Sequence, residues 1–213
     1  MSFIEPDLEN YIENNSSEES EVLKKLNRNT HAHVLSPRML SGHLQGRVLS
    51  MLSHMIKPKY ILEIGTYTGY SAICMAEGLQ KDGELHTLDI NEELEEMVNQ
   101  YIHEAGFENK IIQHIGNAMD IIPHLKKPWD LVFIDADKRN YLNYYQLLID
   151  VLPQGSYIIA DNVLWSGKIL QDKEKMDKST SALDSFNKYI QEDPRVENVL
   201  FPIRDGLMIC RKK

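Results

Sequence analysis

The chain has 213 residues, a length that suits one domain with a sizeable core and is short for two. Its 42% hydrophobic and 26% charged residues are typical of a globular protein, which excludes a fibrous repeat and a large disordered region. The formal net charge of −9 gives no general support for a phosphate-rich partner such as DNA.

The N-terminal segment, residues 1–35, is polar and acidic, and its weak helical periodicity around Leu23 and Leu26 predicts a helix. It lacks the basic start and apolar core of a signal peptide, and no apolar run in the chain approaches the ~20 residues that span a membrane. Cys74 and Cys210 lie in apolar runs without a CxxC spacing, so we expect buried free thiols. These features predict a cytoplasmic protein.

A second helix is predicted from Met39 to Ile56, and Pro58 marks its end. Its apolar residues recur at helical spacing, and we expect this stripe to face the core. The stripe consists of Leu40, Leu44, Val48, Met51, Leu52 and Met55.

Beyond Pro58, short apolar runs alternate with longer amphipathic ones. The predicted strands are 60–64, 84–90, 110–115, 129–135, 155–161, 196–203 and 206–211. The predicted helices between them are 71–80, 92–106, 118–125, 139–152 and 179–193. This alternation predicts a doubly wound α/β fold with a mostly parallel sheet. Only Arg204 and Asp205 separate the last two predicted strands, which are therefore expected to form an antiparallel hairpin.

In such sheets ligands bind beyond the carboxyl ends of the strands. The first strand runs into EIGTYTGYS, residues 63–71, where Gly65 permits a tight turn and close approach of a ligand. Tyr67 occupies the place of the second glycine of a dinucleotide fingerprint, which a pyrophosphate needs for backbone contact. The loop therefore favours a nucleoside without phosphates over a nicotinamide dinucleotide.

The next two strand ends also suit a nucleoside. Asp89 ends the second strand, about twenty residues beyond the loop, where a carboxylate accepts both ribose hydroxyls. The alternative for Asp89 is the N-cap of the helix that begins near Glu92. The third strand ends in Gly116, Asn117 and Ala118, where a small residue lets an adenine ring lie against the backbone.

Oxygen-bearing side chains follow the fourth and fifth strands. Adjacent parallel strands lie about 5 Å apart, so Asp135, Asp161 and Asn162 are expected to converge. No histidine or cysteine cluster accompanies them, and oxygen-only ligation favours Mg²⁺, Mn²⁺ or Ca²⁺ over zinc. The alternative is ordinary loop and capping chemistry. Beside a metal, Lys138 is a candidate general base, and without one it would be a solvated lysine or form a salt bridge to Asp137.

The motifs EIGTYTGYS, FIDADKRNY, IADNVLWSGK and DGL at 205–207 occur in this order. Together they resemble the cation-dependent O-methyltransferases, the family of caffeoyl-CoA and catechol O-methyltransferases. The resemblance runs from about Met39 to the C-terminus. It implies a Rossmann-like class I methyltransferase fold: a central seven-stranded sheet, with helices on both faces. It also implies S-adenosylmethionine as methyl donor, a homodimer, and one domain over 1–213, with 36–213 as catalytic core and 1–35 as a helical lid.

The resemblance also implies a role for each candidate residue. The residues that would line the methionine part of the donor are Ser41, Glu63, Gly65, Thr66 and Ser71. The residues that would hold its ribose and adenine are Asp89, Asn117 and Ala118, and those that would border it elsewhere are Asp135 and Asp137. The metal ligands would be Asp135, Asp161 and Asn162, and Lys138 would be the base for the attacking hydroxyl.

The implied acceptor is a catechol-like small molecule whose adjacent oxygens bind the metal, which acidifies the phenol. Trp165 would cover an aromatic acceptor or serve as a core residue. Ser166 stands where plant enzymes carry asparagine near the substrate, and the N-terminal segment does not align with the family's lid, so both departures leave the acceptor open.

Three alternatives compete with this interpretation. A related enzyme could methylate 5-hydroxyuridine in tRNA, for which Lys126, Lys127 and Arg139, close in sequence to Lys138, would supply phosphate contacts. A nicotinamide oxidoreductase predicts a phosphate-binding loop that the chain lacks. A catalytically silent adaptor predicts the loss of a metal ligand or of Lys138, and all of these are present.

Overall fold

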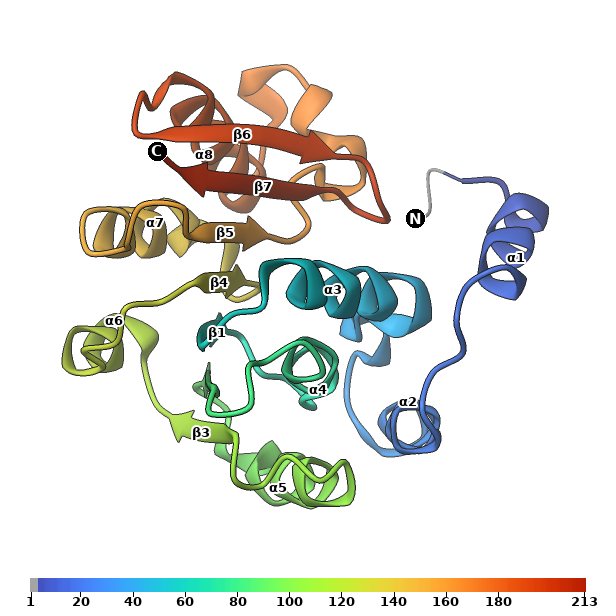
Figure 1. Ribbon diagram of the computed structural model, residues 1–213. Coiled ribbons are helices and arrows are strands. Elements are labelled where there is room, and N and C mark those ends of the chain that lie inside the picture. Colours follow the sequence, from blue (N-terminus) through green and yellow to red (C-terminus); the bar gives the residue numbers. More distant parts are fainter. Residues whose placement is uncertain (1–3) are drawn as a thin grey trace.

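The computed structural model describes residues 4–213, so the first three residues of the predicted segment 1–35 lie outside the described part. The sheet has seven strands in the order β3-β2-β1-β4-β5-β7-β6 (Figure 1). The strands are β1 (Tyr60–Ile64), β2 (Glu84–Asp89), β3 (Ile111–Ile115), β4 (Leu131–Ile134), β5 (Tyr157–Ala160), β6 (Val196–Phe201) and β7 (Leu207–Lys212). Strands β1 to β5 are parallel, and β7 runs antiparallel to both β5 and β6. The predicted α/β sheet and its C-terminal hairpin are confirmed.

Helices cover both faces of the sheet, as predicted. One face carries α2 (Glu21–His33), α3 (Gly42–Ile56), α4 (Tyr70–Ala76) and α5 (Glu95–Glu104), and the other carries α6 (Ala118–Ile121), α7 (Tyr141–Ile149) and α8 (Lys178–Glu192). Short 3₁₀ turns are η1 (Pro37–Met39), η2 (Glu92–Leu94), η3 (Ile122–His124), η4 (Lys138–Asn140), η5 (Trp165–Leu170) and η6 (Lys173–Lys175). Helix α1 (Pro6–Asn14) has no buried residue and stands at the side of the molecule in Figure 1.

The core consists of two hydrophobic layers separated by the sheet. All four residues of β4 are buried, because a central strand is covered on both faces. Val132 and Ile134 pack with α7 and α8, whereas Leu131 and Phe133 pack with the α3–α4 layer. This alternation follows from the two-residue period of a strand.

The helix predicted at 39–56 is confirmed as α3, and four residues of its predicted stripe lie in the core or pack against it: Leu40, Leu44, Val48 and Leu52. The stripe is wrong at Met51 and Met55, which are 62% and 73% exposed. The fully buried residues of the helix are Gln45, Gly46, Leu49, Ser50 and Ser53. Helix α3 packs closely on α4 through this small and polar face. A Cβ at Gly46 would lie 2.6 Å from the Tyr70 ring, so close packing of the two helices selects glycine rather than an apolar side chain there.

The loop of the C-terminal hairpin is longer than Arg204 and Asp205 alone. Strand β6 ends at Phe201 and β7 begins at Leu207, so residues 202–206 form the connection. Pro202 has no N–H for the ladder, which ends β6 early. At Gly206, with φ 86°, a Cβ would lie 2.5 Å from Leu164 Cγ. The connection therefore approaches the segment after β5, where the predicted metal ligands lie.

The remaining expectations for the chain concern its N-terminal helix, its thiols and membranes. Leu23 and Leu26 in α2 are fully buried, which confirms that helix. Cys74 and Cys210 are both buried and free, as expected. In the part of the chain that the structure describes, every helix is too short or too polar to cross a bilayer.

Candidate active site

The carboxyl ends of β1, β4 and β5 lie side by side, and predicted site residues follow them directly. Asp135 N donates to the Ile64 carbonyl at 2.8 Å, and Asp161 N donates to the Ile134 carbonyl at 3.0 Å. Gly65 meets β4 at the same place: its φ is 104°, and a Cβ would lie 2.2 Å from the Asp135 carbonyl oxygen. Only glycine therefore allows the backbone after β1 to approach the end of β4 this closely.

Glu63 is completely buried next to the glycine loop, residues 65–71. Ser71 Oγ and Thr87 Oγ1 each donate a hydrogen bond of 2.5 Å to its carboxyl group. Burial raises the pKa of Glu63 to about 8. The Thr66 and Thr87 hydroxyls also lie 2.5 Å apart. Three predicted residues, Glu63, Thr66 and Ser71, thus belong to one buried network that holds the loop.

Asp89 fastens the glycine loop from β2. Its Oδ2 accepts hydrogen bonds from Thr66 N at 3.0 Å and from Tyr67 N at 2.8 Å. The alternative N-cap role for Asp89 is wrong, because Asn91 accepts from Glu93 N at 3.0 Å and caps the helical turn that follows. Asp89 therefore lies at the rim of the loop, where its contact with a ribose stays a prediction.

A cleft opens at the glycine loop. Its lining residues are Met39, Leu40, Ser41, Gly65, Thr66, Tyr67, Thr68, Tyr70, Ser71 and Asp135. Most of the residues predicted to bind the methionine part of the donor are in this lining. Ser41, only 6% exposed, comes from the chain just before α3, so the fold brings it to the loop from a distant part of the sequence.

Asn117, Ala118 and Asp137 are not among the residues that line this cleft. Asn117 Oδ1 accepts from Met119 N at 3.0 Å and caps α6. Ala118 is buried in the hydrophobic core. Asp137 Oδ1 accepts from Arg139 N at 3.3 Å and caps η4. The structure gives these residues capping and packing roles, and their contacts with the cofactor stay predictions.

The Asp161 carboxylate is buried and bonded on both oxygens. Gln45 Nε2 donates to Oδ2 at 2.5 Å, and Asn162 N donates to Oδ1 at 2.6 Å. Asp161 is 3% exposed, and burial together with the negative charge of Asp135 raises its pKa to about 7. Two carboxylates therefore lie close together where charge is poorly solvated.

The predicted ligand set fits a hard divalent cation. Asp135, Asp161 and Asn162 offer oxygen donors, and a positive charge would stabilise two neighbouring carboxylates. Within residues 4–213, no group of three His, Cys, Asp or Glu side chains is placed to hold a metal. The set therefore needs the Asn162 amide as its third protein ligand.

Lys138 points toward the same strand ends. Its Nζ lies 2.7 Å from Asp135 Oδ1 and 2.7 Å from the Tyr141 hydroxyl, which donates to the Asp161 carbonyl at 3.0 Å. The alternative salt bridge to Asp137 is wrong, because Asp135 is the partner. Burial keeps the pKa of Tyr141 well above its usual value, so the hydroxyl stays protonated and holds Lys138 in place.

Trp165 and Ser166 lie on a loop with left-handed backbone, at φ 47° and 53°. Asp205 holds this loop: its Oδ1 accepts from Ser166 N at 2.5 Å, and its carbonyl accepts from Leu164 N at 2.9 Å. Trp165 packs against the core beside α7 and α8, and its buried Nε1 has no hydrogen-bond partner. Trp165 is thus partly a core residue, and Ser166 is exposed.

Sequence reasoning missed Gln45, Tyr141 and Asp205 as members of the site. Tyr141 and Asp205 lie within the quoted motifs FIDADKRNY and DGL, so the motifs pointed to the right segments without giving these roles. Gln45 had no such signal, because its importance depends on a contact with a residue far along the chain.

The basic residues considered for tRNA do not form one patch. Lys127 Nζ lies 2.7 Å from Glu84 Oε2 and 4.9 Å from the centre of the Tyr60 ring. Glu84 and Tyr60 begin β2 and β1, so Lys127 lies at the amino ends of the strands, whereas Lys138 follows the carboxyl end of β4. The residues that are close in sequence are therefore separated between opposite ends of the sheet. They are Lys126, Lys127, Lys138 and Arg139.

A wider hollow of about 580 Å³ lies along α2. Its lining residues are Glu19, Glu21, Lys24, Asn27, Arg28 and His31. It contains none of the predicted site residues, and Lys24 is already paired with Glu18 and Glu21. The cleft at the glycine loop, and not this hollow, is therefore the candidate site.

Known proteins resemble this chain over nearly its whole length. A caffeoyl-CoA O-methyltransferase of Medicago sativa is 36% identical over 205 residues, which cover 91% of this chain and 83% of the relative. The corresponding enzyme of Petroselinum crispum is also 36% identical and covers 91% and 85%. Both relatives carry the name that the motifs had suggested.

Solved structures agree with these relatives. An O-methyltransferase from Bacillus cereus in complex with SAH matches with a TM-score of 0.90 at 27% identity, over 97% of both chains. The O-methyltransferase TomG from Streptomyces achromogenes, in complex with SAM, matches with a TM-score of 0.87 at 27% identity, over 97% and 96%. The profile of the O-methyltransferase family matches residues 13–213. The chain therefore belongs to the O-methyltransferase family.

Proposed function

We propose that the protein transfers a methyl group from S-adenosylmethionine to a hydroxyl of a catechol-like small molecule, with Mg²⁺ as its metal. The observation that carries the proposal is the position of Lys138 and the Asp135–Asp161 pair directly beside the cleft at the glycine loop. Solved relatives that hold SAM or SAH support the donor. The caffeoyl-CoA O-methyltransferases among the relatives support a phenolic acceptor.

In this proposal each group has one task. The cleft orients the donor, with Gly65 allowing it to approach the backbone and Asp89 at the ribose end. A divalent cation held by Asp135, Asp161 and Asn162 would supply Lewis-acid chemistry that holds the adjacent acceptor oxygens and favours the phenolate. Mn²⁺ or Ca²⁺ would satisfy the same oxygen ligands.

Lys138 takes the proton of the acceptor hydroxyl at Nζ, and Asp135 and Tyr141 hold that nitrogen in place. The acceptor oxygen then forms a bond to the methyl carbon as the sulfur–carbon bond breaks, which leaves a neutral thioether. Much of the rate comes from alignment of the two reacting atoms. Trp165, on the loop after β5, would bound an aromatic acceptor.

The test is transfer of labelled methyl from S-adenosylmethionine to caffeoyl-CoA or a simple catechol, with Mg²⁺ and with EDTA. We expect metal-dependent transfer that falls at least about a hundredfold in Asp161→Ala, since a ligand is lost. Asp150→Ala, which removes an exposed carboxylate paired with Arg195, is the matched control and should retain activity. Equal transfer in EDTA would overturn the metal, and efficient transfer to unmethylated tRNA without phenol activity would overturn the acceptor class.

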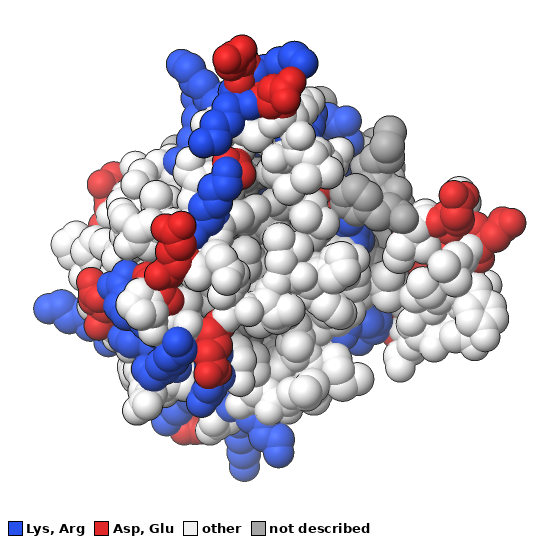
Figure 2. Space-filling model, turned by 90° about the horizontal axis from the view of Figure 1, so that it is seen from above, with Lys and Arg blue, Asp and Glu red and all other residues white. Residues whose placement is uncertain are grey.

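We also propose that the protein is a homodimer, which an exposed apolar surface supports. Met51 and Met55 of α3 and Val199 and Phe201 of β6 are 62%, 73%, 55% and 43% exposed. Phe201 pairs with Leu207, which packs in the α3 layer, so these side chains share one face of the sheet. Strand β6 lies at the top of Figure 1, and the molecule seen from above has a broad uncharged surface with charged borders (Figure 2). Such a surface is typical of a subunit contact.

A further inference from the structure

The glycine loop has an inner and an outer set of side chains. The inner set, Thr66 and Ser71, belongs to the buried network of Glu63. The outer set is Tyr67, Thr68 and Tyr70, and each of its members bonds to the N-terminal segment between Ser17 and Leu35, which we call the clamp. The bonded pairs are Tyr67 Oη to the Leu35 carbonyl at 3.0 Å, Thr30 Oγ1 to Thr68 Oγ1 at 3.2 Å, and Tyr70 Oη to Glu19 Oε1.

Two of these contacts, those of Thr68 and Tyr70, are made away from bulk water, whereas the bond from Tyr67 to the Leu35 carbonyl is exposed. Thr30 and Thr68 are fully buried, and Tyr70 is 2% exposed. Burial raises the pKa of Tyr70 well above its usual value, so its hydroxyl stays protonated and donates to Glu19. A hydroxyl of Thr30 or Tyr70 that lost its partner would be left unsatisfied, which makes these two bonds more costly to break than a surface bond.

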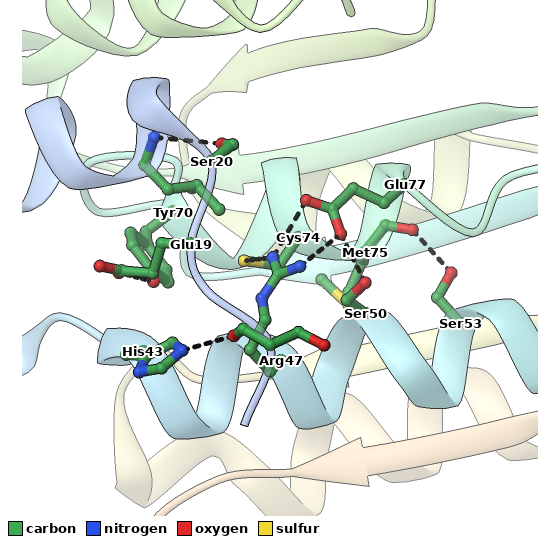
Figure 3. Close-up of polar contacts among 12 residues, drawn as sticks. Glu19, Ser20, His43, Arg47, Ser50, Ser53, Tyr70, Cys74, Met75 and Glu77 are labelled. Carbon is green, nitrogen blue, oxygen red and sulfur yellow. Dashed lines mark hydrogen bonds and ion pairs between the residues drawn. The ribbon is translucent and has the colours of Figure 1, made fainter. Parts of the chain in front are cut away.

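Tyr70, the first residue of α4, also packs against α3. Its ring lies against Gly46, and in Figure 3 Tyr70 and Glu19 lie on one side of Arg47 and Glu77 on the other. The Arg47 guanidinium bonds both Glu77 oxygens at 3.0 Å, which fixes α3 to α4. Tyr70, which is only 2% exposed, is therefore in contact with both the clamp and α3.

The clamp is also attached at points that do not involve the glycine loop. His43 Nε2 bonds the Ser17 carbonyl at 2.7 Å (Figure 3). Lys25 Nζ binds Glu104 at 2.8 Å, and Asn29 Nδ2 donates to the Tyr101 hydroxyl at 3.0 Å. The bonds of Lys25 and Asn29 hold α2 on α5 and supply a matched control, because breaking them loosens the same helix without touching the loop.

We propose that the clamp is a positioning element of the methyl-donor site: Glu19, Thr30 and the Leu35 carbonyl hold the glycine loop in its binding conformation before the donor arrives. A loop with Gly65 and Gly69 is flexible by itself and would lose conformational entropy on binding. Contacts that order it beforehand increase donor affinity without touching the donor. This inference rests on S-adenosylmethionine as the donor, and it gives the N-terminal segment a role beyond covering the acceptor.

The test compares Glu19→Ala/Thr30→Val with Lys25→Met in the full chain. We expect the Kd for S-adenosylhomocysteine, measured by calorimetry, to rise about tenfold in the first variant and to stay within twofold in the second. The KM for the donor should rise while kcat at saturating donor stays close to wild type. Glu19→Gln, whose amide oxygen still accepts from Tyr70, should restore most of the affinity in the Thr30→Val background.

Hydrogen exchange distinguishes positioning from a general loss of stability. In the unliganded protein, the amides of residues 65–71 should exchange faster in Glu19→Ala/Thr30→Val, and those of β4 and β5 should not. Unchanged affinity and exchange in that variant, or equal weakening in Lys25→Met, would overturn the proposal. A wild-type protein that does not bind S-adenosylhomocysteine would instead overturn the donor itself and, with it, this inference.

Discussion

At the scale of residues, the site depends on carboxylates that the fold places in poorly solvated positions. Glu63 and Asp161 have raised pKa values, of about 8 and about 7, because both are buried. Each is retained by short hydrogen bonds from neutral donors, Ser71 and Thr87 for the first and Gln45 for the second. Neutral donors satisfy the buried oxygens without adding a positive charge, and the raised pKa of Glu63 keeps that group largely protonated at neutral pH.

Gln45 provides a prediction at this scale. In Gln45→Leu the Asp161 carboxylate loses a buried donor, so we expect the free energy of unfolding at pH 8 to fall by about 1–3 kcal/mol. Urea denaturation measures it. The matched control is Gln100→Leu, which removes an exposed amide bonded to Glu104 at 2.8 Å and should cost less than about 0.5 kcal/mol. Equal losses in the two variants would show that burial of the Gln45–Asp161 pair has no energetic consequence.

At the scale of elements, β2 and β3 carry a histidine pair at some distance from the cleft. His86 Nδ1 and His114 Nε2 are 2.9 Å apart, with stacked rings whose centroids are 5.1 Å apart. One nitrogen must donate and the other accept, so the accepting ring must be neutral and the bond is lost when both rings are protonated. Burial lowers the pKa of both histidines. A positive charge on His114 would also repel one on His86, which lowers the pKa of His86 further.

The pair makes stability depend on pH. Because the folded pKa values lie below the ordinary value of about 6.5, the pair's contribution is fully present above that pH. This contribution to stability is lost as the pH falls below about 6.5, because the histidines of the unfolded chain take up protons at a higher pH than those of the folded protein. We expect the free energy of unfolding to fall between about pH 6.5 and 5, and His86→Phe/His114→Phe to flatten this slope. Urea denaturation across that range tests it, with exposed His31→Gln as control; an unchanged slope in the double variant would contradict the assignment.

At the scale of the whole molecule, the sequence predicted the order of elements and the family well. Apolar runs at β1, β4 and β5 are periodic and long enough to be recognised, and the residues at their ends form the candidate site. Periodicity failed at α3, where Met51 and Met55 were expected inside, because a helix that packs through Gly46 buries small residues instead. Contacts between distant segments, such as Gln45 with Asp161, have no local signal and needed the structure.

The exposed methionines lead to a prediction about assembly. If α3 and β6 form the contact between subunits, Met55→Lys/Phe201→Lys should convert a dimer to a monomer in light scattering coupled to gel filtration. Charges buried without partners at an interface oppose association by several kcal/mol. Leu170→Lys, which changes a residue that is 85% exposed elsewhere, is the control and should leave the mass unchanged. A wild-type monomer would contradict the dimer, and a dimer in the double variant would exclude this surface.

The contact between Gly65 and the Asp135 carbonyl has a consequence for the range of acceptors. The glycine loop and the end of β4, whose Asp135 is a proposed metal ligand, touch through backbone, so a side chain at position 65 would push them apart. The distance between the proposed donor loop and the proposed metal-binding strand end is therefore set by the backbone of the sheet and not by a variable side chain. In the proposed mechanism, changes in the loop at Trp165 and Ser166 would alter which molecule enters while the reach of the methyl group stays the same.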